Sequence, residues 1–147
     1  MKFMIINGPN LNLLGVREPD LYGAETFQTL LEKIQNHANA INVEVECYQS
    51  NHEGDLVDAI HRAYFEKFDG IVINPGAYTH TSIALLDAVK STNLPTVEIH
   101  ISAVEKREDF RQISYIRMAC IATITGQGTN GYLQAMDTLL NHLQGEV

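Results

Sequence analysis

Five short hydrophobic runs rich in β-branched residues are spread along the chain. Runs of this length, bounded by glycine, proline or polar residues, are typical of buried β-strands. We therefore predict five strands, at residues 3–7, 43–48, 70–74, 96–101 and 120–125.

Apolar residues recur every three to four positions between and after these runs, which is the period of an amphipathic helix. The second helical segment is preceded by Ser50-Asn51-His52-Glu53, an S-x-x-E sequence that predicts a capping box at the helix start. The segments predicted to be helical are 27–41, 56–64, 82–90 and 131–143.

The alternation of strands and helices defines the fold class. It implies crossover connections, a parallel sheet and helices on both faces of that sheet. Five strands in 147 residues suit a flavodoxin-like, three-layer α/β sandwich with strand order 2-1-3-4-5. No linker, repeat or low-complexity segment divides the chain, so we predict one domain over residues 1–147.

Unusual polar loops follow three of the predicted strands. Residues 7–23 follow the first strand and far exceed the roughly 2–6 residues of an ordinary strand-to-helix loop. Residues 74–82 follow the third strand, and residues 98–102 end the fourth. Ligands of such folds bind beyond the carboxyl ends of the strands, and these three strands are neighbours in the predicted order. We therefore expect one cleft lined by all three segments.

Glu98 and His100 are the strongest pair of chemical groups near that cleft. They lie two residues apart on a predicted strand and so share a face. An isolated histidine is more often a satisfied core residue. A carboxylate beside an imidazole, however, orients the ring and keeps it protonated enough to act as a general acid.

The segment after the fourth strand suggests an anion site. Ser102-Ala103-Val104-Glu105 is a second S-x-x-E sequence and predicts a helix start, whose free backbone N–H groups attract a carboxylate or phosphate. Arg107 and Arg111, four residues apart on that predicted helix, either add charge to the site or form a solvated helix face.

The long first loop carries Arg17 and Tyr22. A cation within about 4–6 Å lowers the pKa of a neighbouring acid by about 1–3 units, so an arginine can activate a tyrosinate as a base. Both residue types are common in loops, and the pair alone is weak evidence.

Composition excludes several classes of partner. The net charge is −8, and the ten basic residues are scattered singly, so we expect no nucleic-acid partner. The first apolar run is too short for a signal peptide, and no stretch approaches the ~20 apolar residues of a membrane span. We expect a cytoplasmic protein with no membrane partner, in which Cys47 and Cys120 are reduced core residues of strand-like runs.

Other familiar motifs are absent or misplaced. Residues 126–131 match G-x-G-x-x-G, but they follow the last predicted strand, so a tight turn is the better interpretation than a dinucleotide site. No predicted strand ends in a lysine, which disfavours Schiff-base chemistry. We predict no metal and no cofactor.

Four long segments, taken together, carry a resemblance. "NGPNLNLLGVREPDLYG", "QSNHEGDLVDAI", "INPGAYTHTSIALLDA" and "VEIHIS" followed by "REDFR" closely resemble the type II 3-dehydroquinate dehydratase family. The likeness runs in order from about residue 4 to 115 and more loosely to the end.

The resemblance implies an enzyme that converts 3-dehydroquinate to 3-dehydroshikimate through an enolate, in the shikimate pathway or in quinate catabolism. Tyr22 looks like the base that removes the C2 proton, with Arg17 as its activator. Asn10, with the backbone near Pro9 and Ala77, would hold the water that stabilises the enolate. His100, supported by Glu98, would protonate the departing C1 hydroxyl.

The resemblance also implies a set of binding residues and an assembly. Asp87 would reach the site of a neighbouring subunit, since the family forms trimers grouped into dodecamers. The substrate's hydroxyls and carboxylate would be bound by Asn74, His80, Arg111 and the Ile101–Ser102 backbone.

The chain departs from the family pattern after the fourth strand. Arg117 stands where a serine is usual, and Ala103 stands where an asparagine is expected. The pairs Glu105-Lys106 and Gln112-Ile113 also differ from the usual residues. These changes touch the substrate-carboxylate loop and a subunit interface and so bear on affinity and assembly, whereas every residue with a chemical role is retained.

Three alternatives were weighed. A flavodoxin-like module that binds flavin or phosphate needs a Ser/Thr/Gly-rich loop after the first strand, where this chain has "NGPNLNLLG". A phospho-receiver domain needs acidic residues at positions held by Asn7 and Asn74, so this alternative fails. A non-catalytic relative that keeps the cleft is excluded only by an assay.

Overall fold

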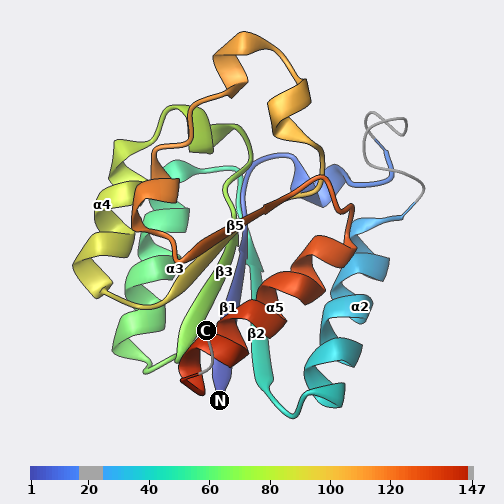
Figure 1. Cartoon of the computed structure of the whole chain (residues 1–147), viewed down its shortest axis with the longest axis vertical. Coiled ribbons are helices and arrows are strands. Elements are labelled where there is room, and N and C mark those ends of the chain that lie inside the picture. Colours follow the sequence, from blue (N-terminus) through green and yellow to red (C-terminus); the bar gives the residue numbers. More distant parts are fainter. Residues whose placement is uncertain (17–24, 146–147) are drawn as a thin grey trace.

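The computed structural model describes residues 1–16 and 25–145. In this part of the chain, five parallel strands form one sheet in the order β2-β1-β3-β4-β5, as predicted (Figure 1). The strands are β1 (Lys2–Asn7), β2 (Glu44–Gln49), β3 (Gly70–Asn74), β4 (Thr96–His100) and β5 (Ala122–Thr125).

Two pairs of helices cover the two faces of the sheet, which confirms the three-layer α/β sandwich (Figure 1). The helices α2 (Phe27–Ala40) and α5 (Asn130–Leu143) pack on one face. The helices α3 (Glu53–Phe65) and α4 (Ile83–Thr92) pack on the other. Successive strand residues point to opposite faces, so continuous apolar runs such as residues 3–6 feed both hydrophobic clusters.

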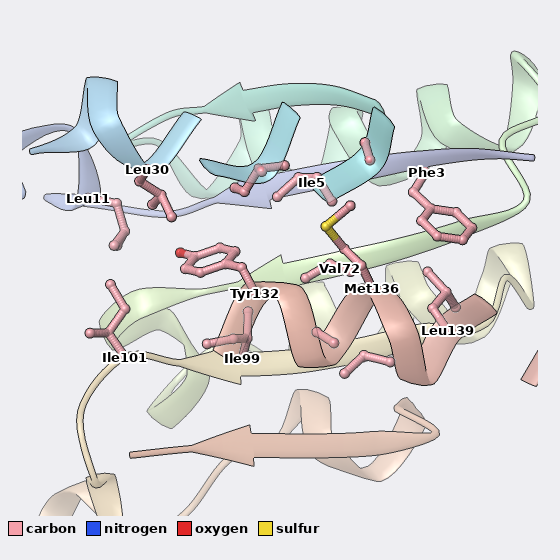
Figure 2. Packing of buried hydrophobic residues seen from close by; sticks show 14 of the residues in the cluster. Phe3, Ile5, Leu11, Leu30, Val72, Ile99, Ile101, Tyr132, Met136 and Leu139 are labelled. Carbon is pink, nitrogen blue, oxygen red and sulfur yellow. The ribbon is translucent and has the colours of Figure 1, made fainter. Parts of the chain in front are cut away.

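The cluster beneath α2 and α5 is built around side chains of α5. Figure 2 shows Tyr132 and Met136 of α5 among the strand residues Val72 and Ile99. These side chains are fully buried or nearly so, and each such burial contributes about 1.5–3 kcal/mol to stability. The cluster extends to Leu11, which places the start of the first loop on the core.

The predicted capping box at the start of α3 is wrong. The helix begins at Glu53, and its N-cap is His52, whose side chain makes no capping hydrogen bond. Ser50 instead accepts a hydrogen bond from the His52 N–H at 3.0 Å and donates to the Asp55 carboxylate at 2.7 Å. The serine therefore stabilises the turn that precedes the helix, two residues ahead of the cap.

The helix predicted after β4 is also wrong. The segment forms two single 3-10 turns, η3 (Val104–Lys106) and η4 (Asp109–Arg111), separated by extended backbone at Arg107. Ala103 holds the N-cap position and makes no side-chain capping bond. Glu105 does not cap the turn, because its carboxylate accepts a hydrogen bond from Thr125 on β5 at 3.0 Å. The segment therefore does not begin a helix of several turns, and an anion contact at the Ile101–Ser102 backbone stays a prediction.

The two cysteines are half-buried, and each packs at the rim of a hydrophobic cluster. Cys47 lies on β2 as predicted, whereas Cys120 follows the 3-10 turn η5 (Ile116–Ala119) and precedes β5. Burial raises the pKa of the Cys47 thiol to about 11 and that of the Cys120 thiol to about 12. Both are therefore poor nucleophiles at neutral pH.

Candidate active site

A cavity of about 150 Å³ lies at the carboxyl ends of β1, β3 and β4, where the sequence predicts a cleft. Its lining comes from the last residues of β3 and β4 and from the segments that follow the three strands. Seven of the predicted site residues line it: Asn10, Asn74, His80, His100, Ile101, Ser102 and Arg111.

The loops after β1 and β3 are held against each other at Gly8. The Gly8 N–H donates to the Asn74 carbonyl at 2.8 Å. A Cβ atom at this position would lie 2.5 Å from the Pro75 carbonyl oxygen, so only glycine permits the approach. Asn10 then takes a left-handed conformation, with φ of 70°, and its N–H donates to the Asn51 side chain at 3.0 Å. These contacts fix the Asn10 backbone at the cavity wall.

A buried, uncharged network holds Asn74. The Tyr132 hydroxyl of α5 donates to Asn7 Oδ1 at 2.6 Å and accepts from Asn74 Nδ2 at 2.9 Å. Asn74 Oδ1 accepts from the Gly76 N–H at 3.1 Å. Burial raises the pKa of Tyr132 well above its usual value, more than the Asn74 hydrogen bond lowers it. Tyr132 therefore stays protonated and serves to position Asn74, not to accept protons.

His100 lines the cleft and contacts the buried Glu98 two residues earlier on β4, as the strand spacing predicts. His100 Nε2 lies 2.5 Å from Glu98 Oε2, and both side chains are buried. Burial alone raises the pKa of Glu98, but hydrogen bonds from His100 and Arg117 hold it well below its usual value. The carboxylate is therefore ionised at neutral pH, and Nδ1 is the imidazole nitrogen left for a bound molecule.

Four further side chains complete the Glu98 environment, and the sequence analysis assigned a role to none of them. They are Thr79, Ser114, Arg117 and Thr123, which donate hydrogen bonds to the two carboxylate oxygens. The register of β4 against β5 pairs Glu98 with Thr123, so strand alignment could have identified that residue. The other three lie on irregular segments, whose path no periodicity predicts.

His80 is held as a neutral ring. Its Nδ1 lies 2.7 Å from the Ile113 carbonyl, which can only accept, so Nδ1 carries the proton. Desolvation by burial lowers the pKa of His80, and the nearby His100 and Arg111 lower it further. The free Nε2 is therefore an acceptor, suited to a hydroxyl of a bound molecule.

Two arginines supply positive charge to the cleft. Arg111 lines it, with its guanidinium paired to the Glu108 carboxylate and stacked on Phe110 at 5.1 Å from the ring centre. Arg107 also lines the cavity. The two arginines do not share one helix face, because the Arg107 backbone is extended and Arg111 belongs to the separate 3-10 turn η4. The chain as a whole carries a net charge of −8, so this local concentration of positive charge favours an anionic ligand in the cleft.

Of the predicted site residues in the described part of the chain, Glu98 and Asp87 do not line the cavity. Arg17 and Tyr22 lie outside the described residues. Asp87 is exposed on α4 and does not line the cavity, so its role at a neighbouring subunit's site stays a prediction. Within residues 1–16 and 25–145, no cluster of three or more His, Cys, Asp or Glu could hold a metal ion. No helix of those residues is both long and apolar enough to span a bilayer.

A five-stranded parallel α/β sheet of this order has the flavodoxin-like fold, and the carboxylate–imidazole pair at its carboxyl edge has the groups that general acid–base chemistry requires. The family model described as dehydroquinase class II matches residues 1–140. The chain therefore belongs to the class II dehydroquinase family.

Individual relatives agree with this assignment along the whole chain. A 3-dehydroquinate dehydratase of Clostridium perfringens is 53% identical over 99% of this chain and 100% of its own. One from Caldicellulosiruptor bescii is 52% identical over 94% of this chain and 95% of its own. The solved type II dehydroquinase of Butyrivibrio crossotus superimposes with a TM-score of 0.94, at 52% identity over 95% of this chain and 97% of its own.

Proposed function

We propose that the cleft eliminates water from 3-dehydroquinate to give 3-dehydroshikimate through an enolate, with His100 as the acid. The chain is a hydro-lyase of the dehydroquinase family, as its full-length relatives establish. The observation that carries the proposed mechanism is that His100 lines the cleft while paired with the buried Glu98, because water elimination needs a proton donor for the leaving hydroxyl.

The reaction divides into two proton transfers. A base removes a proton from C2, and the electrons of that C–H bond move onto the C3 ketone oxygen to give the enolate. The enolate then collapses, the C1–oxygen bond breaks, and His100 gives a proton to the departing hydroxyl, which leaves as water. The negative Glu98 carboxylate stabilises the imidazolium before this transfer.

The enolate oxygen would be stabilised beside Asn10. Pro9, Asn10 and Ala77 line the same part of the cavity, and the Gly8 and Asn51 contacts hold this wall in place. Donors fixed in advance stabilise developing negative charge with little reorganisation, which supports a water held by Asn10 at this position.

The remaining cleft residues suit the hydroxyls and carboxylate of the substrate. Asn74 and neutral His80 offer fixed polar atoms for hydroxyls. Arg111 offers a planar fork that matches a carboxylate. The Ile101–Ser102 backbone lines the same wall and remains the proposed second carboxylate contact.

Tyr22, activated by Arg17, is the proposed base. Tyr22→Phe should lower turnover at least ~10²-fold with little change in binding, the low end for loss of a positioned base. If Arg17 lowers the tyrosine pKa by about 2 units, Arg17→Ala should cost about a hundredfold at neutral pH and recover as pH rises. A pH–rate profile of both variants checks this. Full activity in Tyr22→Phe would eliminate it as the base.

The test of the reaction is an ultraviolet assay for the conjugated enone product with purified protein and 3-dehydroquinate. Enzyme treated with a chelator, or with substrate and borohydride, and then freed of these reagents should form 3-dehydroshikimate from fresh 3-dehydroquinate at the untreated rate, because the proposed route uses neither a metal nor an imine. No product would contradict the function. Inactivation by borohydride through a lysine adduct would contradict the enolate route.

The expected assembly and location are separate proposals. The substrate is the expected small-molecule partner, and twelve subunits built as four trimers are the expected homo-oligomer, in the cytoplasm. In that assembly Asp87 would contact a neighbouring site. Light scattering of the active protein should give a mass well above the 16.4 kDa of one chain. A stable, active monomer would overturn both the assembly and the role of Asp87.

A further inference from the structure

We propose that Arg117 is a positioning residue for this reaction, which acts through the Glu98 carboxylate to orient His100 and to set the pH range in which His100 donates its proton. The inference rests on the proposed function of His100. It concerns a residue of the 3-10 turn η5, which lies between β4 and β5, and this residue is not part of the cleft lining.

The geometry joins the three side chains through one carboxylate. Arg117 Nε donates to Glu98 Oε1 at 2.9 Å, and its Nη2 donates to Oε2 at 3.1 Å. The same Oε2 lies 2.5 Å from His100 Nε2. A two-point contact from a planar guanidinium fixes the plane of the carboxylate. The plane in turn fixes the direction from which the imidazole is held.

The contact between Arg117 and Glu98 also changes the electrostatic environment of His100. Glu98 is completely buried, whereas the Arg117 side chain is 42% exposed, so the arginine connects a buried negative charge to solvent. The hydrogen bond to Glu98 raises the pKa of Arg117 further. With Arg117 in place, its guanidinium and the His100 imidazole share one carboxylate. Without it, the whole negative charge would act on His100 and hold its proton more tightly.

Other charged groups around the trio do not replace Arg117. His80 and Arg111 face His100 from η2 (Gly76–His80) and η4, across the cleft. Glu105 of η3 and the Cys120 thiol group both act electrostatically to raise the pKa of Arg117. Arg107 lines the cleft without contact to Glu98 among the hydrogen bonds of the described residues. Arg117 is thus the arginine hydrogen-bonded to Glu98.

Two substitutions separate charge from geometry. Arg117→Gln keeps hydrogen-bond donors but removes the charge. Arg117→Lys keeps the charge but loses the planar fork. Arg62→Gln is the matched control, because Arg62 is also a partly exposed arginine paired with glutamates, on α3 and away from the cleft.

The test is the pH dependence of kcat and KM for the four proteins, with the alkaline limb of kcat reporting loss of the acid's proton. In Arg117→Gln that limb should move up by about one pH unit, and kcat at neutral pH should fall about tenfold, with KM little changed. Arg117→Lys should keep the parental limb but lose part of kcat. Arg62→Gln should match the parent. An unmoved limb in Arg117→Gln, or a shift of equal size in Arg62→Gln, would overturn the proposal.

A second readout does not need turnover. The imidazole resonances of His100, assigned by their loss in His100→Asn, can be titrated by NMR in the parent and in both Arg117 variants. The His100 titration should move to higher pH in Arg117→Gln and stay near the parent in Arg117→Lys. A parent protein without dehydratase activity would contradict the proposed function, but the effect of Arg117 on the His100 titration could still be measured. Identical His100 titrations in the parent and both Arg117 variants would contradict the coupling between Arg117 and His100, even in an active enzyme.

Discussion

Two buried polar networks meet at the carboxyl edge of the sheet, and they differ in charge. Beneath β1 and β3, Asn7, Asn74 and Tyr132 form a neutral network. On β4, Glu98 joins His100 and Arg117 in a charged one. A neutral network fixes a side chain without responding to pH near neutrality, whereas a charged one both fixes and titrates. Under the proposed function, one network would hold the substrate and the other would transfer protons.

We expect Glu98→Gln to have the largest effect on the charged network. The amide cannot compensate the charge of Arg117 or His100, and its NH2 group faces donors. We expect turnover to fall at least ~10-fold and the free energy of unfolding to fall by about 1–3 kcal/mol, the range for hydrogen bonds to charged groups. Steady-state kinetics and urea denaturation measure the two effects. Parental turnover would show that the carboxylate does not support the acid.

The neutral network should respond differently to Tyr132→Phe. Loss of the hydroxyl leaves Asn7 Oδ1 and Asn74 Nδ2 without this partner inside the protein, which should cost about 1–3 kcal/mol of unfolding free energy. KM should rise severalfold because Asn74 loses its support, while the limbs of the pH–rate profile should stay in place. A shifted limb would mean that this network also handles protons.

Acid stability should depend on the charged network. The folded-state pKa of Glu98 lies below its ordinary value, so the unfolded chain takes up the proton first. The stability from Glu98 is therefore complete above about pH 5 and falls as pH drops below the ordinary glutamate pKa. Unfolding free energies measured from pH 7 to 3 should fall more steeply in the parent than in Glu98→Gln. Parallel curves would contradict the ionised state of Glu98.

Alkaline stability should depend on the neutral network. Burial raises the pKa of Tyr132, so the unfolded chain loses the phenol proton first. Its contribution is complete below about pH 10, the ordinary tyrosine value, and declines above it. The difference in stability between parent and Tyr132→Phe should therefore narrow above pH 10. The cysteines are common to both proteins and cancel in this comparison. A constant difference would contradict the buried, protonated tyrosine.

The spacing of apolar residues along the chain predicted the regular secondary structure. Strand and helix positions follow from the spacing of apolar residues, because burial imposes that spacing. The Glu98–His100 pairing also followed, since residues two apart on a strand share a face. The sheet order and the cleft edge needed one further step, the match of the strand–helix alternation to the flavodoxin-like class.

The rest of the site depends on contacts that spacing does not encode. Ser50 and Ser102 both begin an S-x-x-E sequence, yet neither caps a helix, because other polar partners and backbone bends compete for their segments. Arg117 reaches Glu98 from an irregular turn, and Tyr132 reaches Asn74 from a helix whose spacing indicates only core. Such long-range partners need the packed structure.

The central claim is that His100, held by Glu98, protonates the leaving hydroxyl. The most direct measurement is kcat and KM of His100→Asn beside the parent, by formation of the conjugated enone. Asparagine retains a polar side chain but cannot donate as an acid, so kcat should fall at least ~10²-fold while KM stays within a few-fold. A variant that turns over at the parental rate would contradict the assignment of His100 as the acid.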